Sequence, residues 1–96
     1  MAKSKAADMS NPELAFANSR LGKLLLQTLT EGSSSYQSIA NYLLRNQVRV
    51  TALGIEDLAE SCQVSTATVS RFARDLGFTN FAAMRNEAAE VLQSVF

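Results

Sequence analysis

The sequence has no histidine and a single cysteine, Cys62. Histidine is the side chain most often used for acid and base catalysis and for binding metals. The chain also lacks a glycine-rich phosphate-binding loop and any cluster of cysteines or carboxylates at metal-ligand spacing. We therefore expect a protein that is not an enzyme, with no catalytic residue, no metal site and no cofactor. Cys62 cannot form an internal disulfide, and we interpret it as a small buried apolar residue.

Long apolar runs and a net charge are absent as well. No run approaches the roughly 18 apolar residues of a membrane span, and no secretory apolar segment follows Lys3 and Lys5. These observations predict a cytoplasmic protein without a membrane partner. Nine basic residues balance nine acidic ones, so any binding to nucleic acid has to come from the placement of a few arginines rather than from a basic surface.

The composition that remains indicates one small domain. Apolar residues form 47% and charged residues 19% of the 96 residues, values typical of a globular chain with a single core. Residues 1–10 are small, polar and without a repeating pattern, so we expect a disordered tail there. One domain is expected to follow over residues 11–96.

The first helix is predicted over residues 12–31. Asn11 can cap it, a proline suits its first turn, and a glycine follows its last turn. Its apolar stripe consists of Leu14, Ala17, Leu21, Leu24, Leu25 and Thr28. Phe16, Leu26 and Leu29 lie off this stripe, so a second face also needs cover, either from a partner chain or from this same domain.

A second helix is predicted after a short linker of one glycine and three serines, with Ser34 as its cap, ending near Asn46. Residues 47–53 alternate weakly and contain Val48 and Val50, but no second strand is available to pair with them. We expect this segment to be an extended connection.

Residues 54–77 have the pattern of a helix-turn-helix, which is two short helices joined by a tight turn. The first helix contains a small residue, Ala59, where the second can cross it closely. Gln63 and Val64 form the turn, and Ser65 caps the second helix.

The second of these helices has one apolar and one polar face. Its core-facing residues are Val69, Phe72, Ala73 and Leu76, and Gly77 ends it in a left-handed conformation. The polar face suits the major groove of DNA, because arginine can donate two hydrogen bonds to guanine and short hydroxyls can reach phosphates. The expected DNA-binding residues are Ser65, Thr66, Ala67, Thr68, Ser70, Arg71 and Arg74. Candidate phosphate contacts are Arg45, Arg49 and Arg85, although isolated surface arginines are commonly only solvated.

A last helix is predicted from Asn80, and its apolar residues repeat at helical spacing as Phe81, Met84, Ala88, Val91, Leu92 and Val95. The expected fold class is therefore all-α. We expect a compact five-helix bundle, in which a three-helical DNA-binding core is supported by an N-terminal and a C-terminal helix.

The run IEDLAESCQVSTATVSRFARDLGFTNFAAMRNEAA resembles the N-terminal helix-turn-helix domain of the RpiR family of bacterial transcriptional regulators. The resemblance covers about residues 34–95. Its shorter part, VSTATVSR, is shared with the LacI family and indicates only a helix-turn-helix, whereas the GF pair and the helix after it favour RpiR. One departure is Gln63, which stands where related motifs often have glycine. Glutamine can adopt a positive φ there at a cost of about 1 kcal/mol.

The resemblance implies sequence-specific DNA binding, with residues 66–76 as the recognition helix in the major groove and with genes of sugar or carbon metabolism as targets. In that family a sugar-isomerase-like domain that binds a phosphorylated sugar usually follows. A sugar-phosphate effector is therefore expected only if the natural chain continues into such a domain.

A single recognition helix supplies too little affinity. One bidentate base contact discriminates by about 1–3 kcal/mol, whereas specific regulators bind with roughly 11–15 kcal/mol. We therefore expect a homodimer on double-stranded DNA, with helix 12–31 as the interface. The alternative is a protein-interaction or dimerisation module that keeps this fold without binding DNA, and the zero net charge favours it.

Overall fold

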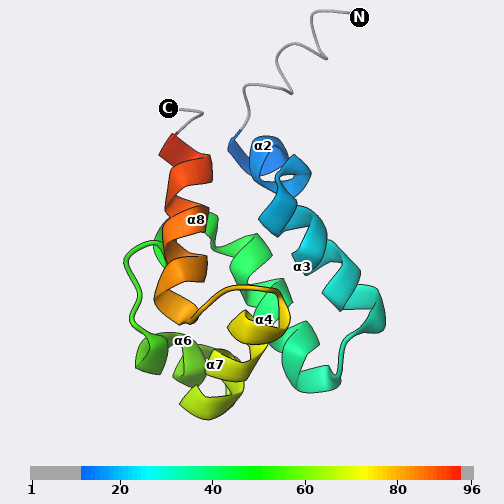
Figure 1. Cartoon of the computed structure of the whole chain (residues 1–96), viewed down its shortest axis with the longest axis vertical. Helices are drawn as coiled ribbons and strands as arrows, with labels where there is room; N and C mark the ends of the chain where they lie inside the picture. Colours follow the sequence, from blue (N-terminus) through cyan, green and yellow to red (C-terminus); the bar gives the residue numbers. More distant parts are fainter. Residues whose placement is uncertain (1–11, 94–96) are drawn as a thin grey trace, which may run out of the picture.

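The computed structural model of the chain describes residues 12–93. In this range it contains seven helices and no strand, so the all-α prediction is confirmed there. The helices (Figure 1) are α2 (Pro12–Asn18), α3 (Arg20–Glu31), α4 (Ser34–Arg45), α5 (Gln47–Val50), α6 (Ile55–Cys62), α7 (Thr66–Asp75) and α8 (Phe81–Gln93). The expected count of five differs because one predicted helix is divided and one predicted connection is helical. The expected tail over residues 1–10 and Val95 lie outside the described residues.

The predicted helix over residues 12–31 is divided at Ser19. This residue has an extended backbone, with φ −73° and ψ 167°. Its hydroxyl accepts a hydrogen bond of 3.0 Å from the amide of Gly22 and donates one of 2.6 Å to the carbonyl of Phe16. Ser19 therefore acts as an N-cap, and α3 begins as a new helix with its own axis.

The division of the helix changes which of its side chains face the core. Phe16, expected off the stripe, is only 1% exposed and belongs to the same buried cluster as Leu21 and Leu25. Thr28 is also buried, whereas Leu26 is 45% exposed. The domain's own core thus covers Phe16, one of the residues expected off the stripe, while Leu26 stays exposed.

The segment after α3 differs from the prediction in two details. Ser33, rather than Ser34, caps α4, because its hydroxyl accepts a hydrogen bond of 3.3 Å from the amide of Tyr36. The extended connection expected over residues 47–53 is wrong, since α5 occupies its first half. Val50 is 3% exposed and α5 packs against α8, so tertiary packing overrides the preference of β-branched residues for extended backbone.

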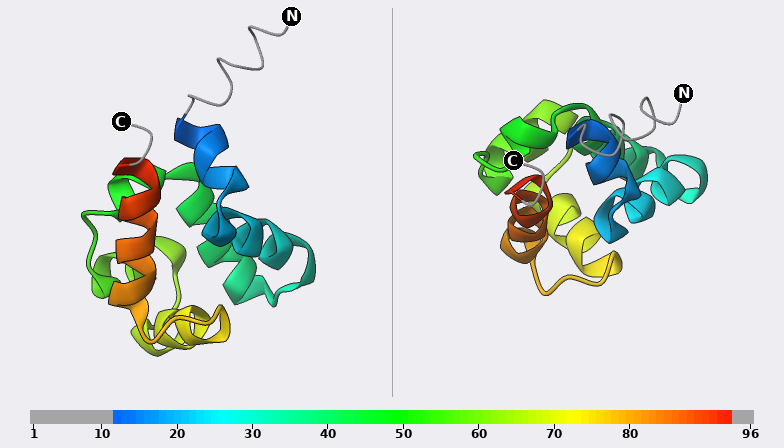
Figure 2. Two further views of the ribbon diagram at one scale, coloured as in Figure 1. Left: turned by 45° about the horizontal axis from the view of Figure 1, so that its top comes forward. Right: turned by 90° about the horizontal axis from the view of Figure 1, so that it is seen from above.

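The remaining helices place α7 at one end of the molecule. α7 packs against α6, α8 and α4, while α8 also contacts α2 and α5. Figure 1 and the left view of Figure 2 show α7 (yellow) at the end opposite the first turn of α2 and the last turn of α8. The largest side chains of the core come from α2, α3, α4, α6, α7 and α8, and they are Phe16, Phe72, Leu21, Leu25, Ile39, Leu58, Met84 and Val69. No helix in the described range is long and apolar enough to cross a lipid bilayer.

Candidate nucleic-acid interface

The turn between α6 and α7 is built on a left-handed residue. Gln63 has φ 59° and ψ 44°, and it is the one residue other than glycine with a positive φ in the described part of the chain. The amide of Val64 donates to the carbonyl of Ala59 at 2.9 Å, and the amide of Gln63 donates to that of Glu60 at 3.1 Å. These bonds form a Schellman motif. The positive φ expected at Gln63 is therefore confirmed.

Both ends of α7 are closed as expected. At its start, the Ser65 hydroxyl accepts a hydrogen bond of 3.1 Å from the amide of Thr68, and the two hydroxyls share another of 2.9 Å. At its end, Gly77 has φ 103°, and the amide of Phe78 donates to the carbonyl of Ala73 at 3.0 Å. These caps define the length and the direction of the helix.

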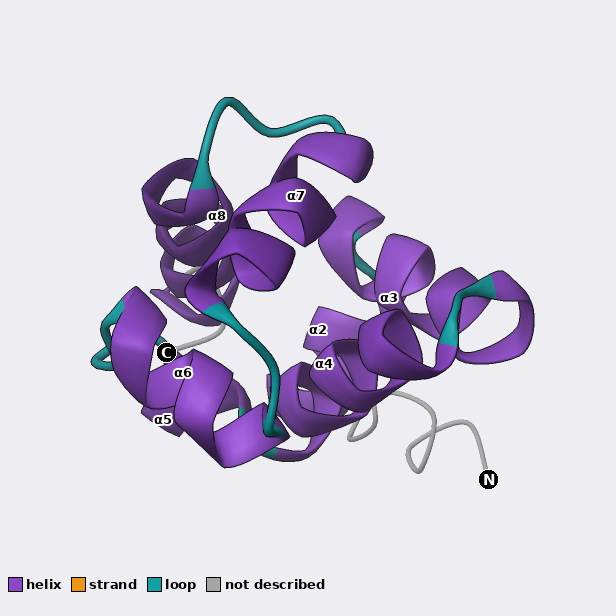
Figure 3. Cartoon of the chain, turned by 90° about the horizontal axis from the view of Figure 1, so that it is seen from below, coloured by secondary structure: helices purple, strands orange, loops and turns teal. Residues whose placement is uncertain are grey.

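The two faces of α7 separate as predicted. Val69, Phe72 and Ala73 are fully buried, and Leu76 is half-buried. Of the expected DNA-binding residues, the exposed ones are Ser65, Thr66, Ala67, Arg71 and Arg74, while Thr68 and Ser70 are half-buried. In the view from below, no other helix crosses in front of α7 (Figure 3). The exposed residues therefore lie on a helix face that is open to a partner.

Two arginines give this face its positive charge. Neither Arg71 nor Arg74 forms an ion pair with a carboxylate of the described residues. Asp75, on the same helix, is also exposed. Its Oδ2 atom instead accepts a hydrogen bond of 2.6 Å from the hydroxyl of Tyr36, a residue 39 positions earlier in the chain.

The sequence interpretation missed this pair, Tyr36 and Asp75. A signal for Asp75 was its position four residues after Arg71, a spacing that places two helical side chains side by side. No local signal points to Tyr36, which the fold alone brings to α7. Its ring packs edge-on against Phe72, with centroids 5.1 Å apart and an interplanar angle of 88°. Burial raises the pKa of Tyr36 to about 12, with further contributions from the hydrogen bond and the charge of Asp75, while Arg71 lowers it.

Residues 20–95 match the helix-turn-helix domain of the rpiR family. The chain belongs to this family. Over 69 residues it is 35% identical to an uncharacterized HTH-type transcriptional regulator of Caldanaerobacter subterraneus subsp. tengcongensis, covering 68% of this chain and 24% of that protein. Over 64 residues it is 31% identical to an uncharacterized HTH-type transcriptional regulator of Providencia stuartii, covering 67% of this chain and 23% of that protein. The chain thus aligns with about a quarter of the length of these relatives. No solved structure matches it significantly.

The resemblance to RpiR regulators is therefore confirmed. Two short helices joined by a tight turn, α6 and α7, lie within the matched residues. The family match begins at Arg20, the first residue of α3. α2 precedes the match and still contributes Phe16 to the core.

The three candidate phosphate contacts lie away from the exposed face of α7 or are engaged within the RpiR-family domain. Arg45 and Arg49 are exposed at the end of α4 and on α5. Arg45 lies away from α7, because it is about 13 Å along the axis of α4 from Tyr36, a residue that contacts α7. The guanidinium of Arg85 donates a hydrogen bond of 3.1 Å to the carbonyl of Leu53 and lies 5.7 Å from the centre of the Phe81 ring. Their contact with phosphates stays a prediction.

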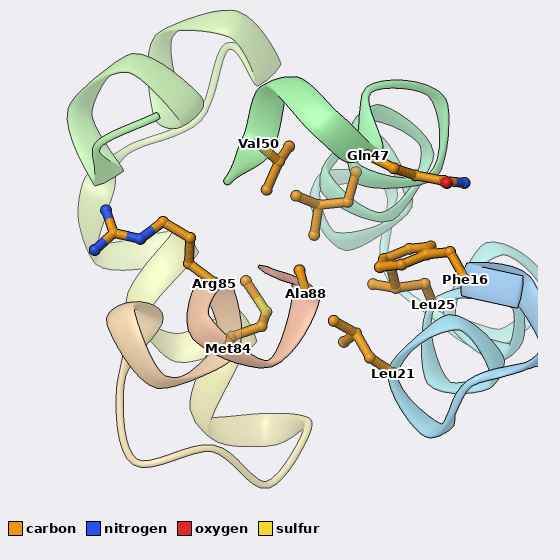
Figure 4. A pocket seen from close by; sticks show the side chains of 9 residues that line it. Phe16, Leu21, Leu25, Gln47, Val50, Met84, Arg85 and Ala88 are labelled. Carbon is orange, nitrogen blue, oxygen red and sulfur yellow. The ribbon is translucent and has the colours of Figure 1, made fainter. Parts of the chain in front are cut away.

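The largely apolar cavity inside the RpiR-family domain has a volume of about 10 Å³. Side chains from α2, α3, α4, α5 and α8 line it, and Figure 4 shows the polar ends of Gln47 and Arg85 pointing away from it. Ligand pockets measure about 300–1,000 Å³, so this space cannot hold a sugar phosphate. Cys62 is buried as expected, and burial raises the pKa of its thiol.

Proposed function

We propose that this RpiR-family domain binds double-stranded DNA sequence-specifically, with α7 in the major groove. The observation that carries the proposal is the open face of α7, where Arg71 and Arg74 are exposed and unpaired among the described residues. The regular helix of α7, closed by caps at both ends, fixes the backbone positions from which these side chains extend. Arginine donors on an exposed helix face can reach the base edges of the major groove.

Each residue of the face has a proposed role. Arg71 and Arg74 donate hydrogen bonds to guanine, and Thr66 and Ala67 contact thymine methyl groups. Ser65 and Ser70 contact phosphates. Thr68 supports the cap through its bond to Ser65. Arg45, Arg49 and Arg85 are proposed to add phosphate contacts on a bent or longer DNA site, since they lie away from the α7 face.

The working form is proposed to be a homodimer that binds two half-sites. One recognition helix supplies only part of the roughly 11–15 kcal/mol of specific binding. Because much of the apolar stripe over residues 12–31 is used by the core, the dimer contact on this segment is proposed to be the exposed face of α3 around Leu26. Sedimentation at high protein concentration tests this contact, and a Leu26→Glu variant should dissociate.

The regulated genes are proposed to be those of sugar or carbon metabolism, in the cytoplasm of a bacterium. The chain aligns with about a quarter of the length of its curated relatives, so the proposed phosphosugar effector is assigned to a part of the protein outside this domain.

Selection of bound sequences from random duplexes, followed by titration of the selected site, tests the proposal. Arg71→Ala should weaken specific binding at least tenfold and leave binding to unrelated duplexes nearly unchanged, because a bidentate base contact discriminates by about 1–3 kcal/mol. Arg45→Ala removes the same charge far from α7 and serves as the matched control, which should weaken binding to all duplexes alike. A folded protein that binds no duplex at low salt would favour the alternative, a protein-interaction module.

A further inference from the structure

Asp75 is a carboxylate on the helix that is proposed to face DNA. Residues four apart on a helix are neighbours, so Asp75 can reach the guanidinium of Arg71. An ion pair between them would occupy a proposed base-binding side chain. The carboxylate would also stand close to the DNA phosphates and repel them. Nevertheless, the structure shows no ion pair between Arg71 and Asp75.

Asp75 is held by Tyr36 instead. The Tyr36 hydroxyl donates a hydrogen bond of 2.6 Å to Asp75 Oδ2. We propose that Tyr36 is a positioning residue for DNA recognition, because its hydroxyl holds Asp75 on the α4 side of α7 and leaves Arg71 available to DNA. This inference rests on the proposed function.

The core fixes the position of the Tyr36 hydroxyl. The ring stands edge-on to Phe72, which is fully buried in α7. The backbone amide of Tyr36 is bonded to Ser33, the cap of α4. The donor is therefore placed by two packed helices rather than by a freely rotating surface side chain.

Arg71 is the cation on α7 that competes for Asp75. Asp75 is the last residue of α7, where the negative end of the helix dipole disfavours a carboxylate and a cationic or hydrogen-bonding partner stabilises it. The charge of Arg71 reaches the Tyr36 hydroxyl, since it lowers the pKa of that group. Arg71 lies four residues before Asp75 on the same helix, a spacing at which the two side chains are neighbours.

The groove beside the pair offers Asp75 no cation. Tyr36 and Asp75 line an open groove of about 230 Å³ between α3, α4 and α7, and no arginine or lysine lines it. The other carboxylate that lines this groove belongs to Glu31, and it accepts a hydrogen bond of 3.1 Å from Gln27. Loss of the Tyr36 hydroxyl therefore leaves Arg71 as the partner that Asp75 can reach.

The test is Tyr36→Phe, which removes the hydroxyl and keeps the ring. We expect affinity for the selected duplex to fall about 1.5- to 5-fold, the range of an exposed ion pair. The double variant Tyr36→Phe/Asp75→Asn should bind as tightly as Asp75→Asn alone, because the amide cannot pair with Arg71 as a carboxylate does. Tyr42→Phe, on the same helix and away from α7, is the matched control and should bind as the wild type does.

A purely structural role for Tyr36 predicts a different outcome. Loss of folding would weaken binding in both variants, and Asp75→Asn would not restore it. That result, or unchanged binding by Tyr36→Phe, would overturn the inference. If the wild type binds no duplex, the proposed function fails, and the NMR signal of the Arg71 side-chain Nε then tests separately whether the Tyr36 hydroxyl keeps Asp75 away from Arg71. The signal should shift in Tyr36→Phe and return in the double variant, and an unmoved signal contradicts the inference.

Discussion

The carbonyl oxygen of Phe16 occupies the space that a Cβ on Gly22 would need. A Cβ built at position 22 would lie 1.9 Å from this oxygen and 2.8 Å from the Cα of Ala17. Both contacts are with backbone atoms, which cannot rotate away. The close approach of α2 to the start of α3 therefore depends on glycine, and with it the burial of the Phe16 ring.

Gly22→Ala is expected to destabilise the domain by about 1–3 kcal/mol, the usual cost of overpacking a core. Urea unfolding followed by circular dichroism measures this change. Gly54→Ala is the matched control, because no atom lies within 4 Å of a Cβ at that position. Equal urea midpoints for the two variants would contradict this expectation, because they would show that the packing of α2 against α3 accommodates a Cβ at position 22.

Gln63→Gly is expected to stabilise the domain by about 0.5–1 kcal/mol. Glycine removes the strain of a left-handed backbone, although it also adds freedom to the unfolded chain. Gln63→Ala keeps the strained Cβ and should leave the stability nearly unchanged. If both variants shift the urea midpoint equally, the effect comes from the lost glutamine side chain and not from the φ of 59°.

Ser65→Ala is expected to cost about 1 kcal/mol, because the amide of Thr68 loses its cap at the start of α7. Ser33→Ala should cost a similar amount at the start of α4. Ser34→Ala is the control, since Ser33 and not Ser34 caps α4. Thermal unfolding measures all three variants, and a loss at Ser34 that equals the loss at Ser33 would contradict the cap assignment.

The stability of the domain is expected to fall between about pH 10 and pH 12. The folded state raises the pKa of Tyr36 from 10.0 to about 12. A raised pKa contributes stability that is full below the unfolded value and is lost as the pH rises through the folded value. Asp75 raises the pKa of the Tyr36 hydroxyl, whereas the charge of Arg71 lowers it. Urea midpoints against pH measure the loss, and Tyr36→Phe should show a smaller one. If the urea midpoints of the wild type and of Tyr36→Phe decline in parallel with pH, Tyr36 is not the cause of the loss of stability.

Local patterns predicted much of the fold and of the candidate interface. Ser65 as a cap, Gly77 as a left-handed stop and the buried face of α7 all follow from neighbouring residues, because helix periods and caps depend on positions within one or two turns. The family resemblance rests on the same run and is confirmed.

The sequence by itself thus determined the helical class, the helix-turn-helix and the polar face of α7. Only the tertiary structure decided that the first helix divides at Ser19, that residues 47–50 are helical and that Tyr36 holds Asp75. The last two depend on packing between segments distant in the chain, α5 against α8 and Tyr36 against Phe72. Local propensities differ by less than 1 kcal/mol per residue, so burial of a single large side chain, at about 1.5–3 kcal/mol, overrides them.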